Sequence, residues 1–145
     1  MLEQRIQDLL GSQQLVYASP NSSITQAAKI MAEAHVGAVL VGSVDEVSGI
    51  ISERDILERV IVPGLSADKT TLSEVLTSEP VFVTPAETMH IAMTNMKEQR
   101  SRYVLVKSGS QVVGIISVVD VLRAVVDAGV EEAHKYDHLW EGIPI

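Results

Sequence analysis

The sequence contains no cysteine and few aromatic residues. The missing cysteine excludes disulfide bonds, thiolate metal sites and a cysteine nucleophile. Aromatic residues make up 3% of the 145 residues, so the core has to be built from Val, Ile, Leu, Ala and Met. Hydrophobic residues make up 46% and charged residues 21%, which is the composition of a folded domain rather than of a disordered chain.

Long apolar runs and an excess of positive charge are also missing. No apolar stretch approaches the roughly 18 residues of a membrane span, and the polar, amphipathic first ten residues do not resemble a signal peptide. We therefore expect a cytoplasmic protein without a membrane partner. The 11 Lys and Arg are outnumbered by 19 Asp and Glu, which argues against a nucleic-acid partner because phosphate backbones require clustered basic residues. A small phosphorylated ligand would depend on a few local arginines.

An internal repeat with an offset of 65 residues is the strongest pattern in the sequence. Between residues 16 and 60, 17 of 45 positions are identical to the residue 65 positions further on, without a gap. Unrelated segments of ordinary composition would match at about one position in sixteen, so the chain contains two copies of one unit. The identical pairs include Pro20 and Pro85, Met31 and Met96, Gly49 and Gly114, Ser52 and Ser117, and Asp55 and Asp120.

Each copy has the same predicted order of elements. A short amphipathic helix, a brief strand and a proline turn lead into a longer helix, which is followed by two apolar β-rich runs and a last helix. Apolar residues of the longer helix recur at the i, i+3, i+4, i+7 spacing of one buried face. The first copy has helices at 2–10, 24–34 and 55–61 and strands at 16–18, 38–41 and 47–51; the second has helices at 73–76, 89–99 and 120–128 and strands at 81–83, 103–106 and 112–116.

These copies predict an α+β fold made of two β-α-β-β-α repeats. One copy of about 60 residues is marginal for burying a core by itself. We therefore expect the two sheets to pack with pseudo-two-fold symmetry and to act as one domain. The expected boundaries are 1–62 for the first repeat, 63–71 for a linker, 72–128 for the second repeat and 129–145 for a tail.

A Ser-x-x-Asp segment begins the last helix of each copy, from Ser52 to Asp55 and from Ser117 to Asp120. One interpretation is a capping box, in which the serine accepts a hydrogen bond from the first helical turn and the aspartate favours the positive end of the helix dipole. A second interpretation is a ligand site. The two interpretations are compatible because a helix N-terminus already favours negative charge.

With these motifs, the sequence resembles a tandem pair of cystathionine-β-synthase (CBS) domains, also called a Bateman module. The resemblance rests on the pattern strand, proline turn, helix, strand and strand ending in Gly-h-h-Ser-x-x-Asp (h, hydrophobic), which occurs twice at matched positions between residues 6 and 128. It implies a regulatory module that binds adenosine-containing ligands in clefts between the repeats and that often forms homodimers. The ligands of the family include AMP, ADP, ATP, S-adenosylmethionine and NAD.

The resemblance implies one cleft around each aspartate. The carboxylate would accept charge-assisted hydrogen bonds from both ribose hydroxyls, while Ser52 or Ser117 orients the sugar or a phosphate. The first strand of the other repeat would contact adenine, so that Asp55 faces residues 81–84 and Asp120 faces residues 16–19. The residues expected to contribute from these strands are Val16, Ala18 and Ser19 in the first copy, and Val81, Val83 and Thr84 in the second.

Basic residues distinguish the Asp55 cleft. The resemblance places Arg100 and Arg102 near it, and Arg54 lies inside its Ser-x-x-Asp segment. Guanidinium groups suit phosphate oxygens, although an arginine on a helix can equally be a solvated surface residue. We expect this cleft to bind a phosphorylated nucleotide.

The Asp120 cleft has fewer basic residues. Only His35 is expected nearby, and Arg123 lies one turn further along the last helix. We expect this cleft to be empty, weaker or specific for a less charged adenosyl ligand.

The tail lies outside the repeat. His134 and His138 are four residues apart with Asp137 between them, but no third ligand is evident, and we expect no metal site. Trp140 with its neighbours Leu139, Ile143 and Ile145 is too apolar for a free end and is expected to dock on the domain or on a partner subunit.

No residue pattern suggests an enzyme, since nucleophile–base pairs, phosphate loops and metal clusters are not found in the sequence. The favoured hypothesis is a sensor of adenine nucleotides of the AMP, ADP or ATP class. It would act on an unidentified partner protein through a change in the angle between the repeats or in the dimer. The alternatives are an S-adenosylmethionine or NAD sensor and an interaction or dimerisation module that binds no nucleotide.

Overall fold

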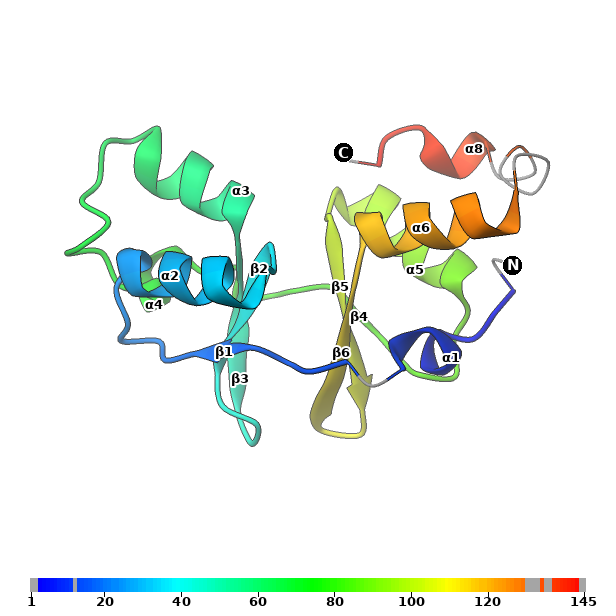
Figure 1. Ribbon diagram of the computed structural model, residues 1–145, viewed down its shortest axis with the longest axis horizontal. Helices are drawn as coiled ribbons and strands as arrows, with labels where there is room; N and C mark the ends of the chain where they lie inside the picture. Colours follow the sequence, from blue (N-terminus) through cyan, green and yellow to red (C-terminus); the bar gives the residue numbers. More distant parts are fainter. Residues whose placement is uncertain (1–2, 12, 130–133, 135–136, 144–145) are drawn as a thin grey trace. The chain divides into compact units, whose positions relative to one another are not determined.

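The computed structural model describes residues 3–11, 13–129, 134 and 137–143. The chain forms two compact units, each with its own three-stranded sheet (Figure 1). The first-repeat unit consists of Leu15–Pro80. The second-repeat unit combines Met1–Gln14 with Val81–Ile145. The mixed α+β class expected from the sequence is confirmed.

The first-repeat unit has a sheet with the strand order β1-β2-β3, and Figure 1 shows α2 and α3 on one side of it. The first strand is parallel to β2, and β2 is antiparallel to β3. A polar turn closes the β2–β3 hairpin, where the Ser43 N–H donates to the Glu46 carbonyl over 2.8 Å. The elements are β1 (Tyr17–Ala18), α2 (Ile24–Ala34), β2 (Ala38–Gly42), β3 (Val47–Ser52), α3 (Glu53–Ile56), η1 (Leu57–Ile61) and α4 (Leu72–Val75).

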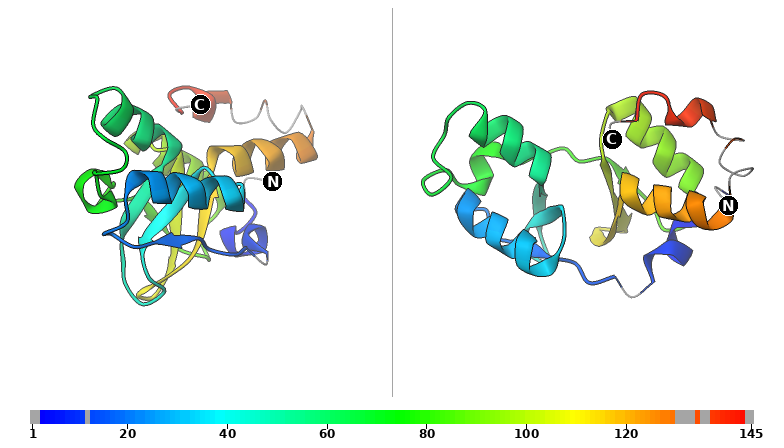
Figure 2. Two further views of the ribbon diagram at one scale, coloured as in Figure 1. Left: turned by 60° about the vertical axis from the view of Figure 1, so that its left-hand side comes forward. Right: turned by 45° about the horizontal axis from the view of Figure 1, so that its top comes forward.

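The second-repeat unit repeats this topology with the order β4-β5-β6. Here β4 is parallel to β5, and β5 is antiparallel to β6. Figure 2 shows α5 and α6 running beside the sheet. The elements are α1 (Ile6–Leu10), β4 (Phe82–Val83), α5 (Met89–Gln99), β5 (Tyr103–Ser108), β6 (Gln111–Ser117), α6 (Val118–Ala128) and α8 (Asp137–Trp140).

The helices α2 and α5 occupy the residues expected from the hydrophobic spacing, whereas the last helix of the first copy differs. It begins at Glu53 and changes at Leu57 into the π-helical segment η1, in which the Val62 N–H donates to the Leu57 carbonyl. The equivalent helix α6 is a regular α-helix up to Ala128. Helical spacing does not distinguish a π-turn from an α-turn, so the sequence pattern could not predict this difference.

Each short helix packs with the larger elements of the other copy. In α1, the Ile6 and Gln7 N–H groups donate to the carbonyls of Glu87 and Pro85, each over 2.9 Å. In α4, the Leu72 and Ser73 N–H groups donate over 3.0 Å to the equivalent carbonyls of the first copy, those of Ser22 and Pro20. The compact units therefore do not coincide with the sequence repeats. This exchange joins segments distant in sequence, which local patterns cannot reveal.

Each unit has its own apolar core, built mainly from Val, Ile, Leu, Ala and Met as the composition requires. In the first-repeat unit, Ile24 and Leu72 are fully buried with the sheet residues of β2 and β3. In the second-repeat unit, Ile6 joins the core beside three methionines of α5. No helix among the described residues is both long and apolar enough to cross a membrane.

The tail contributes to the core of the second-repeat unit, and α8 lies beside α5 (Figure 2). Leu139 and Ile143 are buried in this core, and the Lys97 Nζ donates to the His138 carbonyl over 2.6 Å. The expectation that the apolar tail docks on the domain is therefore confirmed for these two residues. The Trp140 side chain and Ile145 lie outside the described part of the chain.

Candidate functional site

The Ser52–Asp55 segment forms a complete capping box at the start of α3. The Ser52 N–H donates to Asp55 Oδ2 over 2.9 Å, and the Asp55 N–H donates to Ser52 Oγ over 3.2 Å. Serine 52 is buried, and 15% of the Asp55 side chain is exposed. The structural interpretation of this motif is confirmed, and the same geometry holds one carboxylate oxygen against the backbone.

The Ser117–Asp120 segment forms the same capping box at the start of α6. The Ser117 N–H and hydroxyl both donate to Asp120 Oδ2, over 2.8 and 3.0 Å, and the Asp120 N–H donates to Ser117 Oγ over 3.1 Å. The Asp120 side chain is 38% exposed. Its Oδ1 lies 3.9 Å from Arg123 Nη1, and that arginine side chain is 70% exposed. Asp120 therefore presents one carboxylate oxygen more openly than Asp55 does.

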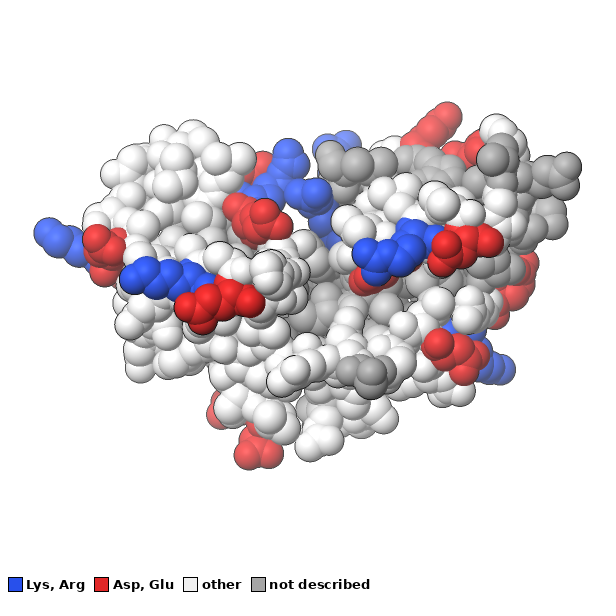
Figure 3. Space-filling model, in the orientation of Figure 1, with Lys and Arg blue, Asp and Glu red and all other residues white. Residues whose placement is uncertain are grey.

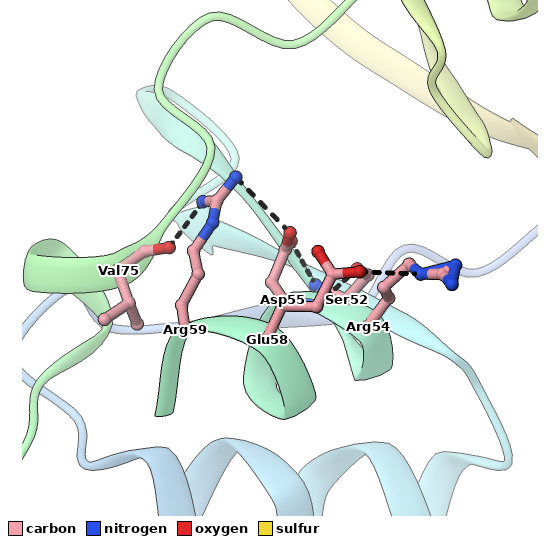
Figure 4. A network of polar contacts seen from close by, with 6 residues as sticks. All are labelled: Ser52, Arg54, Asp55, Glu58, Arg59 and Val75. Carbon is pink, nitrogen blue, oxygen red and sulfur yellow. Dashed lines mark hydrogen bonds and ion pairs between the residues drawn. The ribbon is translucent and has the colours of Figure 1, made fainter. Parts of the chain in front are cut away.

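An arginine that the sequence analysis did not select faces Asp55 (Figure 4). Arg59 Nη2 lies 3.6 Å from Asp55 Oδ1, and its Nη1 donates to the Val75 carbonyl over 2.7 Å. The spacing of four residues on a helix is the signal that could have found the ion pair. The bond to Val75 depends on how α4 packs, which the spacing does not show.

Arg54, which was selected, extends away from the Arg59 guanidinium in Figure 4. Its Nε lies 3.1 Å from Glu58 Oε1, and both side chains are largely exposed. An exposed pair of this kind contributes little to stability. The Arg54 guanidinium is therefore accessible from solvent and is held only by this weak ion pair.

His35 and Arg100 end the equivalent helices α2 and α5, and both have left-handed backbone conformations, with φ of 56° and 49°. Among the described residues they are the two non-glycine residues with positive φ. Such conformations are unfavourable for residues with a Cβ. Both positions belong to the basic residues selected from the sequence.

Arg102 directly precedes β5 and lies beside the first residue of α6 in its own unit. Its carbonyl accepts a hydrogen bond from the Val118 N–H over 3.0 Å, and Gly37 accepts the equivalent bond from Glu53 over 2.9 Å. In each unit, the residue before β2 or β5 is therefore hydrogen-bonded to the residue that follows the capping serine. The expected pairing of Asp55 with residues 81–84, and of Asp120 with residues 16–19, joins residues of different units and stays a prediction.

The strand residues expected to contact adenine have similar positions in the two units. Ala18 and Val83 are buried in the cores, while Val16 and Val81 are partly exposed beside them. Two hydroxyls follow these strands. Ser19 Oγ accepts a hydrogen bond from the Asn21 N–H over 3.3 Å, and Thr84 Oγ1 donates to Glu87 Oε1 over 3.3 Å.

Asp120 lines a hollow of about 430 Å³ in the second-repeat unit. This volume is within the usual range of small-molecule sites. Arg123 and a second carboxylate, that of Asp127, lie on the same α6 wall. The remaining lining residues are Gln4, Leu9, Gln13, Met89, Ile116, Ala124 and Ala128.

His35 lines a separate hollow in the first-repeat unit, which is largely apolar. Its other lining residues are Ala28, Met31, Ala32, Val36, Gly37, Glu53 and Ile56. Asp55 is not among them. In this unit, the aspartate and the hollow are therefore separate features.

Charged side chains of both signs are mixed on the face that Figure 3 shows. On the face drawn in Figure 3, Lys and Arg stand next to Asp and Glu at several places instead of gathering into a broad basic surface. In the tail, His134 Nδ1 lies 3.3 Å from Asp137 Oδ2, with both side chains exposed. The described residues contain no group of three His, Cys, Asp or Glu side chains that could hold a metal ion.

Comparisons with known proteins match this duplicated architecture. The family model of the CBS domain matches residues 6–62 and 72–127. CBS domain-containing protein CBSX3, mitochondrial, from Arabidopsis thaliana is 32% identical over 132 residues, which are 88% of this chain and 64% of that protein. The chain thus spans less than two thirds of this relative.

Solved structures share the fold. A protein with CBS domains from Burkholderia ambifaria is 27% identical, with a TM-score of 0.81 over 88% of this chain and 97% of that one. A CBS domain protein from Pyrobaculum aerophilum, complexed with AMP, is 26% identical, with a TM-score of 0.76 over 90% of this chain and 99% of that one.

The repeated β-α-β-β-α units and their paired capping boxes define a tandem pair of CBS domains, which is a regulatory module. The chain belongs to the CBS-domain family.

Proposed function

We propose that this protein is a sensor of adenosine-containing nucleotides, in which the carboxylates of Asp55 and Asp120 receive the ribose. The observation that carries the proposal is the duplicated capping box, which holds a carboxylate at the start of the last helix in each unit. A ribose offers two adjacent hydroxyl donors, and an ionised carboxylate can accept both. The AMP-complexed relative from Pyrobaculum aerophilum supports the choice of ligand class.

Phosphate recognition is proposed for Arg54, Arg100 and Arg102. Arg54 is exposed beside Asp55, and Arg102 lies next to the start of α6 through its bond with Val118. Arg100 at the end of α5 is exposed and held in an unfavourable backbone conformation, a feature often found at functional positions. A guanidinium fork can bind two phosphate oxygens at once, which compensates locally for the net charge of −8.

The hollow beside Asp120 favours a second candidate, S-adenosylmethionine. Asp120 and Asp127 give this hollow two carboxylates against one guanidinium, that of Arg123. A second carboxylate opposes a phosphate but attracts the positively charged sulfonium and ammonium groups of S-adenosylmethionine. The charge of the ligand that binds at this hollow therefore distinguishes a phosphorylated nucleotide from S-adenosylmethionine.

Isothermal titration with AMP, ADP, ATP, NAD and S-adenosylmethionine tests the proposal. We expect at least one of these ligands to bind, and Asp120→Asn to weaken binding at its site about tenfold or more, because the loss of charge weakens both ribose hydrogen bonds. Asn keeps an oxygen that can accept the Ser117 N–H. Thermal unfolding verifies that the variant remains folded.

Asp45→Asn is the matched control, since it removes one negative charge from the exposed β2–β3 turn. It should bind like the unchanged protein. If no adenosyl ligand binds, or if neither Asp55→Asn nor Asp120→Asn changes the affinity, the proposal is wrong. In that case, a stable dimer without ligand would support the interaction module.

A further inference from the structure

We propose that Arg59 acts as a latch that restricts ligand access to Asp55, so that the two carboxylates of this protein differ in availability. The inference rests on the proposed function, because it assigns to Arg59 the control of one of the two ribose-binding groups. It differs from the sequence-based expectation, in which arginines near Asp55 only favour a phosphorylated ligand.

Both oxygens of the Asp55 carboxylate already have partners within the unit. Oδ2 accepts the Ser52 N–H, and Oδ1 faces the Arg59 guanidinium at 3.6 Å. A ribose with two hydroxyl donors needs two accessible acceptor positions. Only 15% of the Asp55 side chain is exposed, so a ligand has to displace Arg59 to reach Oδ1.

Arg59 is itself held in place from the other side. Its Nη1 donates to the Val75 carbonyl over 2.7 Å, so one guanidinium joins η1 to α4 (Figure 4). The Arg59 side chain is 43% exposed, which leaves it a solvated position to move into when a ligand arrives. The latch is therefore closed by two modest interactions, which binding of a ligand can exchange for others.

The second copy provides the comparison without a latch. The position equivalent to Arg59 is Ala124, whose methyl side chain cannot reach or neutralise a carboxylate. Asp120 instead has Arg123 at 3.9 Å, on a side chain that is 70% exposed and forms no hydrogen bond with the backbone of the described residues. The side chain of Asp120 is more than twice as exposed as that of Asp55, at 38% against 15%.

The helix geometry of the two copies also differs at this position. Arg59 lies within the π-helical segment Leu57–Ile61, whereas the equivalent residues of α6 form a regular α-helix. Segments of π-helix occur mostly as single turns and often at functional positions. The two copies thus diverge in side chain, backbone and exposure at the same place.

The decisive experiment measures AMP binding by isothermal titration in an Asp120→Asn background, which leaves Asp55 as the ribose acceptor. We expect the additional change Arg59→Gln to strengthen AMP binding about fivefold to tenfold, the equivalent of releasing one modest ion pair and one hydrogen bond. Removal of a positive charge would by itself weaken the binding of a phosphate. A gain in affinity therefore cannot arise from the lost attraction between Arg59 and the phosphate.

Two further variants separate the latch from other roles. Lys29→Gln removes a positive charge from α2 in the same unit and should not strengthen binding. Arg59→Lys keeps the charge but cannot reproduce a fork that joins Asp55 to Val75, so we expect an intermediate gain. Loss of a residue with only a structural role would lower both the unfolding midpoint and the affinity. Loss of the latch should lower the midpoint by about 3 °C and raise the affinity.

The possible results are distinct. If the unchanged protein binds an adenosyl ligand but Arg59→Gln leaves the affinity of the Asp55 site unchanged or lowers it, the latch is wrong and the proposed function stands. If no variant binds any adenosyl ligand, the proposed function fails, and the latch fails with it. Hydrogen exchange gives a check that needs no ligand: protection of amides 72–77 should fall in Arg59→Gln but not in Lys29→Gln.

Discussion

Gln13 and Ile115 form two reciprocal hydrogen bonds across 102 residues of sequence. The side-chain amide of Gln13 donates to the Ile115 carbonyl over 2.9 Å, and its oxygen accepts the Ile115 N–H over 2.8 Å. One side chain therefore pairs with the outer edge of β6 as a neighbouring strand would. This pairing attaches the segment after α1 to the second-repeat unit and places Gln13 in the same hollow as Asp120.

Replacement of this glutamine tests how the N-terminal segment is held. Gln13→Leu should lower the free energy of unfolding by about 1–2 kcal/mol, because two backbone groups of Ile115 lose their partner. Urea unfolding measures the change. Gln14→Leu adds the same side chain to the neighbouring exposed position and should stay within about 0.5 kcal/mol. Equal effects of both variants would contradict the role of the amide.

The equivalent glycines Gly49 and Gly114 should respond differently to alanine. A Cβ at Gly49 would lie 2.3 Å from the Thr77 carbonyl oxygen, which belongs to the backbone. A Cβ at Gly114 would lie 2.4 Å from Leu10 Cδ2, the end of a flexible side chain. We expect Gly49→Ala to lower the free energy of unfolding by about 3 kcal/mol and Gly114→Ala by about 1 kcal/mol.

Thermal or urea unfolding of the two glycine variants, side by side, measures this difference. We expect the smaller loss for Gly114→Ala because Leu10 can adopt another rotamer, whereas Thr77 is fixed by its bonds with Ile50 in both directions. A larger loss for Gly114→Ala than for Gly49→Ala would show that the packing of α1, and not that of residue 77, is the more rigid of the two.

Arg100 should carry a cost in stability that glycine would remove. Its φ of 49° is unfavourable for a residue with a Cβ, so Arg100→Gly should raise the free energy of unfolding by about 0.5–1 kcal/mol. Glu98→Gly, inside α5, should lower it by about 1 kcal/mol. The same Arg100→Gly variant should weaken nucleotide binding if the guanidinium meets a phosphate.

Stability and binding are measured separately for this variant, by urea unfolding and by titration with AMP and adenosine. A loss of affinity for AMP but not for adenosine would show that Arg100 contributes to binding through the phosphate. Unchanged affinity for both ligands would exclude Arg100 from the site and leave its backbone conformation as a matter of helix termination alone.

The duplicated pattern made most of the fold predictable. The 65-residue match, the period of the apolar residues and the Ser-x-x-Asp motifs predicted helices α2 and α5 to the residue and both capping boxes. These features are local: spacing within a helix and a cap four residues long depend on neighbours in the chain. The clustering of apolar residues in the tail likewise predicted that it would dock.

Most of the features that the sequence did not reveal depend on contacts between distant segments. The exchange of α1 and α4 between the copies depends on which carbonyls meet Ile6 and Leu72. The role of Arg59 depends on the Val75 carbonyl, which α4 brings within reach. Gln13 was not selected because its partner is 102 residues away.

The sequence by itself therefore determined that the chain contains two copies of one unit, each with a serine and an aspartate at the start of its last helix. It could not determine that the two aspartates differ in availability, since both hold the same place in the Ser-x-x-Asp motif and the contacts of Arg59 depend on a segment distant in sequence. Tertiary structure decided this difference. A carboxylate is accessible or not according to the groups that fold against it, and Arg59 reaches Asp55 only because the packed α4 also holds that arginine.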